Sequence, residues 1–311
     1  MPQIRARLAA KFHDLALSVG MSAWCAHRQN VRRILMIHRV GPHEELTAEG
    51  LEHGLQWLSS RFRLVSLGEL IDGVATGSQP RGEIALTFDD GLRCQLEHAY
   101  PVLVRCNAPA TFFVCPGLIE SRKWLWNHEA RARLQRLDAP SLAHHAANWG
   151  TSATGIDGII HWMKTLDPST LKTVESRIRL ATPDFLPSDE ERARFEPLTW
   201  TDLSRLDPGL VTIGSHTLSH PILPTLEAAA LERELRESRA LLEEQLDRTV
   251  DLFCYPNGSM DERVRAAAAR AYNAAVVTEP GHVQPDADLF GLRRIGFPDR
   301  LSLLAWRIHR P

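Results

Sequence analysis

The chain has 311 residues, enough for two average domains or for one large α/β barrel. Its hydrophobic fraction of 44% and charged fraction of 24% are typical of a soluble globular protein, and a net charge of −2 gives no electrostatic basis for binding nucleic acid. The five cysteines show no C-x-x-C spacing, which argues against a zinc knuckle and favours free thiols in a reducing compartment.

Residues 1–33 are predicted to form an amphipathic helical arm, because apolar residues recur there at helical spacing with basic residues between them. The apolar part is too short to cross a bilayer and too dilute for a good signal peptide. We expect the arm to pack on the main domain, with peripheral contact to a membrane surface as the alternative. A cytoplasmic location is therefore expected, membrane-peripheral in that alternative, and a periplasmic or secreted location is less favoured.

From residue 34 onward, apolar runs of strand length alternate with amphipathic stretches of helical period. The expected strands are Ile34–Ile37, Ile84–Phe88, Thr111–Cys115, Val211–Ile213, Leu252–Tyr255, Ala274–Thr278 and Leu292–Ile295. The clearest expected helix covers residues 226–246, and others cover Ala48–Phe62 and Ser66–Val74. This alternation predicts a parallel sheet, either open or closed into a barrel, within one domain at 34–311.

Residues 120–198 interrupt the alternation. They contain Trp124, Trp126, Trp149 and Trp162, many charged residues and no convincing strand. We expect a helical and irregular insertion between two barrel strands, placed where it can cap one end of the barrel.

Two short motifs place chemically active side chains directly after expected strands. LTFDDGL, residues 86–92, contains Asp89 and Asp90, and VTIGSHTLSHP, residues 211–221, contains His216 and His220. Each motif alone has an ordinary explanation, a surface turn for the first and two surface histidines for the second. In parallel α/β folds, however, the carboxyl ends of the strands meet at one edge. One carboxylate and two imidazoles there can hold a metal ion, and the other carboxylate can take a proton from water.

The same motifs carry a family resemblance. TFDDG (87–91) and SHTLSH (215–220) match the first two signature motifs of the polysaccharide deacetylases, carbohydrate esterase family 4, and FCYPNG (253–258) resembles the subgroup with an F-x-Y-P-N-G motif. The likeness covers most of residues 34–300 apart from the insertion. It implies a distorted (β/α)7 barrel, a divalent metal ion and the removal of N-acetyl groups from sugars.

Carried over position by position, the resemblance implies that Asp90, His216 and His220 bind one divalent ion and that Asp89 is the general base. Zinc is the expected ion, and cobalt, manganese or iron also suit this ligand set. The backbone N–H of Tyr255 matches the donor that binds the oxyanion.

Two positions depart from the common family pattern. No arginine lies in DLFCYPNG, and Arg294 resembles the arginine that replaces it in the F-x-Y-P-N-G subgroup; the alternative is a surface arginine. The histidine that usually serves as general acid is missing from LFGLRRIGFP. We expect His38 to replace it in preference to His282, with a slow enzyme that has no dedicated acid as the remaining alternative.

The sequence therefore favours a metal-dependent hydrolase that removes N-acetyl groups from an amino-sugar polymer, oligomer or glycoconjugate. The alternatives are a carbohydrate-binding barrel with weak or no catalysis and an amidohydrolase that acts on a non-carbohydrate amide. The expected partner is an N-acetylated carbohydrate. Trp124 or Trp126 can stack on a sugar ring or fill a core.

Overall fold

The computed structural model describes residues 2–311, with side chains from residue 8 onward, and it is built on a ring of parallel strands. The strands are β1 (Arg33–Ile37), β2 (Arg63–Leu64), β3 (Glu83–Phe88), β4 (Ala110–Val114), β5 (Val211–Ser215), β6 (Leu252–Cys254), β7 (Ala274–Pro280) and β8 (Leu292–Gly296). Their order is β1-β8-β7-β6-β5-β4-β3, and β1 also pairs with β3, so seven strands close a barrel to which β2 adds a short edge. This confirms the expected distorted (β/α)7 barrel.

The barrel strands form where the apolar runs lie. β3 and β4 are buried along their whole length, because one face of each strand fills the barrel and the other is covered by helices. β1 and β3 pair in register over five residues, from Arg33 with Ile84 to Ile37 with Phe88. This pairing brings the carboxyl ends of β1 and β3, and the residues that follow them, side by side.

The barrel is uneven around its circumference. β5 and β6 share one register pair, Ser215 with Phe253, and the register between β7 and β8 shifts between Val276 and Pro280. Between β7 and β8 the described chain has no helix, only the connection 281–291. These features account for the distortion relative to a regular barrel of alternating strands and helices.

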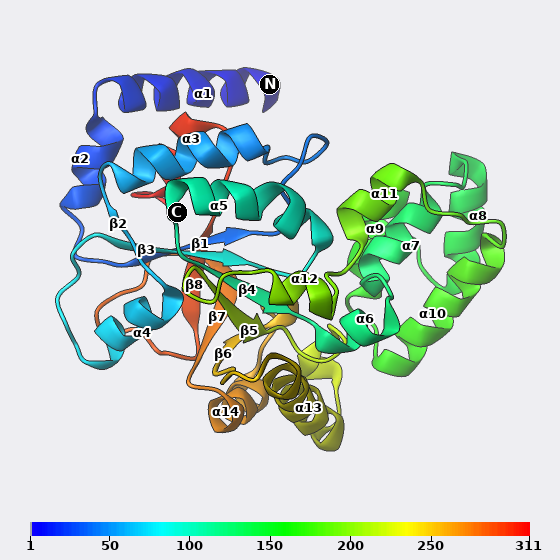
Figure 1. The fold of residues 1–311 in the computed structure, drawn as a ribbon. Coiled ribbons are helices and arrows are strands. Elements are labelled where there is room, and N and C mark those ends of the chain that lie inside the picture. The colour runs from blue at the N-terminus through cyan, green and yellow to red at the C-terminus, as the bar shows by residue number, and fades with distance from the viewer. Residues whose placement is uncertain (1) are drawn as a thin grey trace.

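Helices surround the ring, as Figure 1 shows, with α3 and α5 on one side and α13 and α14 on the opposite side. The barrel helices are α3 (Ala48–Ser59), α4 (Leu67–Ala75), α5 (Tyr100–Cys106), α12 (Trp200–Ser204), α13 (Ala228–Leu246), α14 (Glu262–Ala271) and α15 (Leu301–Arg307). Short helical turns are η1 (Gln95–Ala99), η2 (Leu223–Thr225) and η3 (Pro256–Gly258). Thr47 and Ser66 cap α3 and α4 by accepting a backbone N–H with their hydroxyl oxygens.

The segment between β4 and α12 forms a separate helical lobe beside the barrel (Figure 1). Its helices are α6 (Pro116–Ser121), α7 (Trp126–Leu134), α8 (Ala139–Trp149), α9 (Gly155–Met163), α10 (Pro168–Ala181) and α11 (Asp189–Phe195). Leu134, Ile159, Met163 and Val174 are almost completely buried in a core of its own. The insertion therefore has enough apolar contact to hold a defined shape, which a loop of this length without helices would lack.

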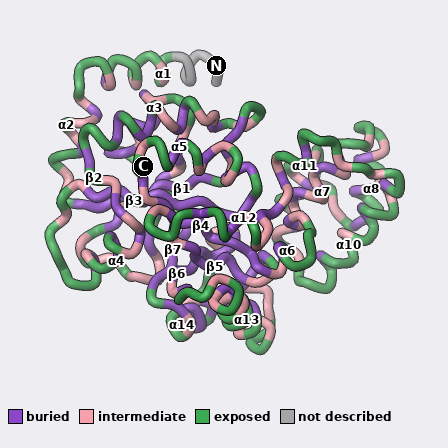
Figure 2. Tube along the Cα trace, in the orientation of Figure 1, coloured by how far each residue is buried: buried purple, intermediate pink, exposed green. Residues whose placement is uncertain are grey.

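The N-terminal arm consists of α1 (Pro2–Ser18) and α2 (Met21–His27), directly before β1. Its described part lies outermost, over α15 and α3, and much of it is exposed (Figure 2). Among residues 2–311, none of the helices combines the length and the apolar character needed to cross a membrane.

Candidate active site

Two sharp turns bring the predicted ligands together at the carboxyl ends of β3 and β5. Asp90 follows β3 with a φ of 77°, and Gly91 has a φ of 64°. A Cβ on Gly91 would lie 2.8 Å from a side-chain atom of Val114 and 3.1 Å from its Cα, so only glycine fits this turn. After β5, His220 also has a positive φ, 60°, and its backbone N–H donates to the Thr217 hydroxyl at 2.9 Å. Strained backbone of this kind is concentrated at functional sites.

The turns place three metal-ligand atoms in one buried cluster. Asp90 Oδ1 lies 3.6 Å from His216 Nε2 and 3.6 Å from His220 Nε2, and all three side chains are buried. Ligand atoms of a tetrahedral zinc site are separated by roughly 3.3–3.4 Å, given bonds of about 2.0–2.1 Å. The cluster therefore needs little movement to hold a divalent ion, and one carboxylate with two imidazoles is a ligand set that such ions take in proteins.

Neighbouring groups hold the two imidazoles in place. His216 Nδ1–H donates to the carbonyl oxygen of Cys254 at 2.7 Å, so Nε2, which is directed at Asp90, is the nitrogen available to a metal ion. Burial lowers the pKa of His216, but the neighbouring Cys254, Asp90 and Asp89 groups outweigh burial and raise that pKa above its ordinary value, so metal binding would release a proton from Nε2. His220 Nδ1 is buried, and among the described residues no partner is within hydrogen-bond distance of it. Burial lowers the pKa of His220 to about 3, so its ring is neutral, as a metal ligand must be.

Asp89, the neighbour of Asp90, binds an arginine instead. Arg294 donates to both of its carboxylate oxygens at 2.7 Å, and both side chains are almost completely buried. The same guanidinium donates to Thr87 Oγ1 and to the carbonyl oxygen of Val277, both at 2.9 Å. Burial alone raises the pKa of Asp89, but the Arg294 charge and hydrogen bonds outweigh burial and hold that pKa below its ordinary value. Asp89 is thus an ionised carboxylate of fixed orientation.

A second possible ligand group shares His216, and it fits a metal ion less well. Asp89, His216 and Cys254 also place one ligand atom each within 4.8 Å of one another. Both oxygens of Asp89 are already bound by Arg294. Burial raises the pKa of the Cys254 thiol, whereas a metal binds the thiolate. Asp90, His216 and His220 are therefore the better set.

The two candidate acids lie in different places. His38 directly follows β1, its Nε2 is 3.8 Å from Asp89 Oδ2, and its side chain is 44% exposed, so it reaches both the site and solvent. His282 Nε2 bonds the carbonyl oxygen of Ile308, which also accepts from Arg33 at the other end of β1. Of the two histidines, His38 alone lies at the cluster.

A buried glutamine, which the sequence did not single out, fixes the backbone at this point. Gln95 Nε2 donates to the carbonyl oxygens of His38 at 2.7 Å and of Asp89 at 2.5 Å. One amide group therefore ties the end of β1 to the end of β3. A glutamine near the start of CQLEHAY carries no sequence signal for this role.

The backbone N–H of Tyr255, which we expect from the sequence to bind the oxyanion, is used within the sheet. The backbone N–H of Tyr255 donates to the carbonyl oxygen of Val276 at 3.3 Å, because β6 and β7 continue their pairing by one more residue. It is therefore already hydrogen-bonded. Two residues later, Asn257 has a φ of 56°, and its Nδ2 is buried without a partner among the described residues. Within the part of the chain that the structure describes, the Asn257 side chain is thus an unpaired hydrogen-bond donor in FCYPNG.

The comparison with known protein families agrees with this geometry. The family model named polysaccharide deacetylase matches residues 76–167 and 196–276, more than half of the chain and both metal-ligand motifs. This chain belongs to the polysaccharide deacetylase family. A Bacillus subtilis (strain 168) protein described as a polysaccharide deacetylase, YxkH, is 29% identical over 86 residues. That match covers 27% of this deacetylase-family chain and 31% of the length of YxkH.

Solved structures share the fold over nearly the whole chain. The Streptococcus pyogenes deacetylase PplD in complex with acetate is 18% identical with a TM-score of 0.62, covering 91% of this chain and 100% of its own. IcaB from Ammonifex degensii is 19% identical with a TM-score of 0.61, covering 90% and 98%. At these identities the likeness concerns the fold.

The helical insertion of this family member brings two titratable side chains, His128 and Lys164, near the site. His128 in α7 is buried, its ring packs on Phe195 at 4.7 Å between centroids, and its Nε2 lies 3.4 Å from Arg39 Nη1. Burial lowers the pKa of His128 to about 3, and the Asp90 charge opposes that shift. Lys164, after α9, is half-buried; burial lowers its pKa and Asp90 again opposes the shift. The sequence did not predict either residue, because only the insertion's fold brings them near the barrel.

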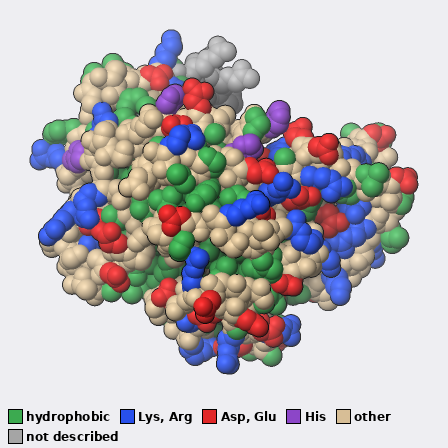
Figure 3. All heavy atoms as spheres, viewed as in Figure 1, with side chains coloured by type: hydrophobic (Ala, Val, Ile, Leu, Met, Phe, Trp, Pro, Cys, Tyr) green, Lys and Arg blue, Asp and Glu red, His purple; other side chains and the backbone are tan. Residues whose placement is uncertain are grey.

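A groove of about 350 Å³ runs between the insertion and the barrel, from His220 to the start of α7. Trp124 and Trp126 line it beside Lys172 of α10 and the loop 219–225. Trp124 also packs on Phe195, and Trp126 packs with Trp149 and Trp162 at the insertion's core. Figure 3 shows basic and acidic side chains interspersed over the insertion.

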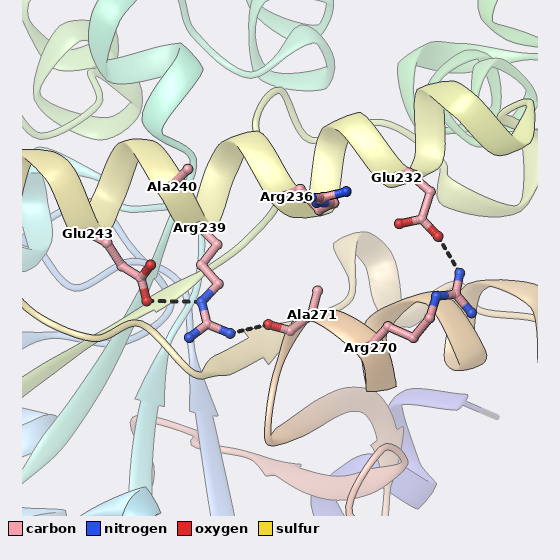
Figure 4. Close-up of a pocket in the computed structure, with 7 residues that line it drawn as sticks. All are labelled: Glu232, Arg236, Arg239, Ala240, Glu243, Arg270 and Ala271. Carbon is pink, nitrogen blue, oxygen red and sulfur yellow. Dashed lines mark hydrogen bonds and ion pairs between the residues drawn. The ribbon is translucent and has the colours of Figure 1, made fainter.

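A second depression, between α13 and α14, contains none of these residues (Figure 4). Arg239 of α13 binds Glu243 at 2.9 Å and the carbonyl oxygen of Ala271, and Arg270 of α14 binds Glu232. The Arg239–Glu243 pair lies within α13, and the Arg270–Glu232 pair joins the two helices. The depression is thus a helix–helix contact.

Proposed function

We propose that this chain is a metal-dependent hydrolase that removes N-acetyl groups from an amino-sugar polymer, oligomer or glycoconjugate. The observation that carries the proposal is the buried cluster of Asp90, His216 and His220 beside a carboxylate, Asp89, that a buried arginine keeps ionised. Family membership supports the class of reaction. A ligand cluster and a separate base are the two parts that hydrolysis of an unactivated amide requires.

Asp90, His216 and His220 would hold one divalent ion, with zinc favoured and cobalt, manganese or iron also suited to the set. Such an ion, when bound, polarises the amide carbonyl and makes water acidic enough to be deprotonated near neutral pH. Asp89 would take that proton at its carboxylate. Arg294 acts through Asp89, since its two hydrogen bonds keep the carboxylate ionised and fix its direction. This role of Arg294 fits the proposed F-x-Y-P-N-G subgroup.

His38 would give a proton to the leaving nitrogen. It faces Asp89 from the neighbouring strand end, and Gln95 holds the backbone of both residues. An amine cannot leave a tetrahedral carbon easily without a proton donor, and a partly exposed imidazole can regain its proton from solvent. The Asn257 amide would donate to the carbonyl oxygen as negative charge develops on it, in the role first expected of Tyr255.

The groove along the insertion would hold the rest of the sugar chain. It begins at His220, so a sugar whose N-acetyl group reaches the cluster has its neighbours along the insertion. Trp126 lines the groove with a ring that is only partly buried, and a flat indole suits the apolar face of a sugar ring. The substrate class proposed is therefore a short stretch of N-acetylated amino sugars.

The experiment measures metal content and acetate release on the same preparations. Wild type is expected to retain one divalent ion per chain and to release acetate from N-acetylglucosamine oligomers. His216→Ala should lose both, whereas His53→Ala, an exposed histidine on α3, should lose neither. Bound metal that survives His216→Ala would refute the ligand set. Bound metal without acetate release from any N-acetylated glycan would favour a binding barrel or a non-carbohydrate amide.

A further inference from the structure

The N-terminal arm has an unusually apolar outer face. Among the described residues, nine large hydrophobic side chains are exposed, and five of them lie between residues 8 and 24. These five are Leu8 (62% exposed), Phe12 (48%), Leu15 (59%), Val19 (66%) and Trp24 (60%). The first four are spaced by four, three and four residues, which places them along one side of a helix. We call these five residues the outer row.

Most of the contact between α1 and the barrel is made by residues outside the outer row. His13 stacks on Trp306 of α15 at 5.0 Å between ring centroids, and Ala16 is buried. Arg300 donates to the carbonyl oxygen of Ala10 at 2.7 Å and to the Asp14 carboxylate at 2.6 Å. α1 is thus attached mainly by residues outside the outer row, and Phe12 of the row also contacts Trp306, with ring centroids 5.2 Å apart. α1 is the outermost layer of the molecule (Figure 2), and the five residues of the outer row remain 48–66% exposed.

The charge of the arm indicates what covers the outer row. Residues 1–28 contain four basic residues and one acidic residue, whereas the rest of the chain contains 32 basic and 37 acidic residues. The one acidic residue, Asp14, is paired with Arg300. Lys11 is exposed within the row, and the Arg28 guanidinium lies over the Trp24 ring, 4.9 Å from its centroid. An apolar row with basic flanks and a tryptophan matches the apolar interior, anionic headgroups and interfacial layer of a membrane.

A second copy of the chain fits this face less well. Pairing two arms would bring two segments with an excess of positive charge against each other, which costs free energy. We propose that the outer row binds the surface of a lipid bilayer that contains anionic headgroups, with α1 lying in the plane of the interface. This binding is independent of the deacetylase reaction, and it would hold the barrel next to a membrane.

The test is co-sedimentation of the full chain with lipid vesicles. Wild type should bind vesicles of phosphatidylcholine with about 30% phosphatidylglycerol, and binding to phosphatidylcholine alone should be at least about tenfold weaker. Leu15→Glu/Val19→Glu should reduce binding by about tenfold or more, because two charged side chains would have to enter the apolar layer. Leu180→Glu/Leu186→Glu is the matched control: these leucines are each 79% exposed, but they lie on the insertion. The control should bind as wild type does.

Thermal unfolding of both double variants checks that each is folded. Wild type that does not bind anionic vesicles would overturn the proposal, and so would equal binding by wild type and Leu15→Glu/Val19→Glu. Analytical ultracentrifugation tests the alternative that a second copy of the chain binds the outer row, because it measures whether the chain is a monomer or a dimer. A wild-type dimer that Leu15→Glu/Val19→Glu converts to a monomer, without vesicle binding by either, would assign the outer row to a second copy instead.

Discussion

Replacing Arg294 with methionine should destabilise the fold strongly, because it leaves the Asp89 carboxylate buried without its partner. The two side chains are 0% and 1% exposed and share two hydrogen bonds of 2.7 Å. Removing one member of such a buried pair costs about 3–5 kcal/mol of unfolding free energy. The matched control is Arg293→Met: Arg293 is 51% exposed and pairs with the exposed Glu279, so its loss should cost less than about 1 kcal/mol.

Urea unfolding of metal-free protein measures these differences at neutral and at acid pH. Since the pKa of Asp89 is held below its ordinary value in the folded state, the pair stabilises the fold above that ordinary value, near 4. This stabilisation is lost as the pH falls through the folded-state pKa, so wild type and Arg294→Met should converge in acid. Adding Asp89→Asn to Arg294→Met should recover about 1–3 kcal/mol. If Arg294→Met lowered the unfolding free energy by no more than Arg293→Met does, and if that difference from wild type stayed the same at acid pH, this account of the Asp89–Arg294 pair would be refuted.

Three further outcomes are expected. Gly91→Ala should abolish metal binding and lower the unfolding free energy by about 1–3 kcal/mol, measured by metal analysis and urea unfolding, because its φ is positive and a Cβ would meet Val114. His38→Ala should remove the alkaline limb of the pH profile of kcat/KM, whereas His282→Ala should leave it in place; unchanged profiles in both would leave solvent water as the acid. Asn257→Ala should lower kcat about 10²–10³-fold with metal content unchanged, and an unaltered kcat would exclude its amide from the reaction.

The barrel could be predicted because its signals are local. Each barrel strand is a short apolar run, and a parallel barrel places the residues after these runs at one end. Asp90, His216 and His220 were found in this way, since each lies within a few residues of a strand end. The partnership of Asp89 with Arg294 was not accessible to periodicity or spacing, because 205 residues separate them; only the family resemblance indicated it.

The sequence did not reveal which groups near the site are already engaged. The family resemblance implies an N–H of Tyr255 that is free for a ligand, but Tyr255 ends the apolar run Leu252–Tyr255 and its N–H is used in a hydrogen bond to Val276 of β7. Gln95 lies in an unremarkable helical stretch and becomes important only where β1 and β3 end together. His128 and Lys164 depend on how the insertion folds back on the barrel. Such properties belong to tertiary contacts, which a single sequence does not specify.

The N-terminal arm shows a related difficulty. From the sequence, packing on the main domain and contact with a membrane are alternatives, because a single apolar periodicity predicts a single apolar face and that face can contact only one of the two. In the structure, contact with the body uses the apolar Phe12 and Leu17, and also His13, Ala16 and the paired Asp14, which a hydrophobic pattern does not single out. The apolar residues that gave the pattern, Leu15 and Val19 among them, remain exposed. A helix whose contacts with the body leave most of its apolar row exposed keeps that row for another surface, so the two interpretations are compatible.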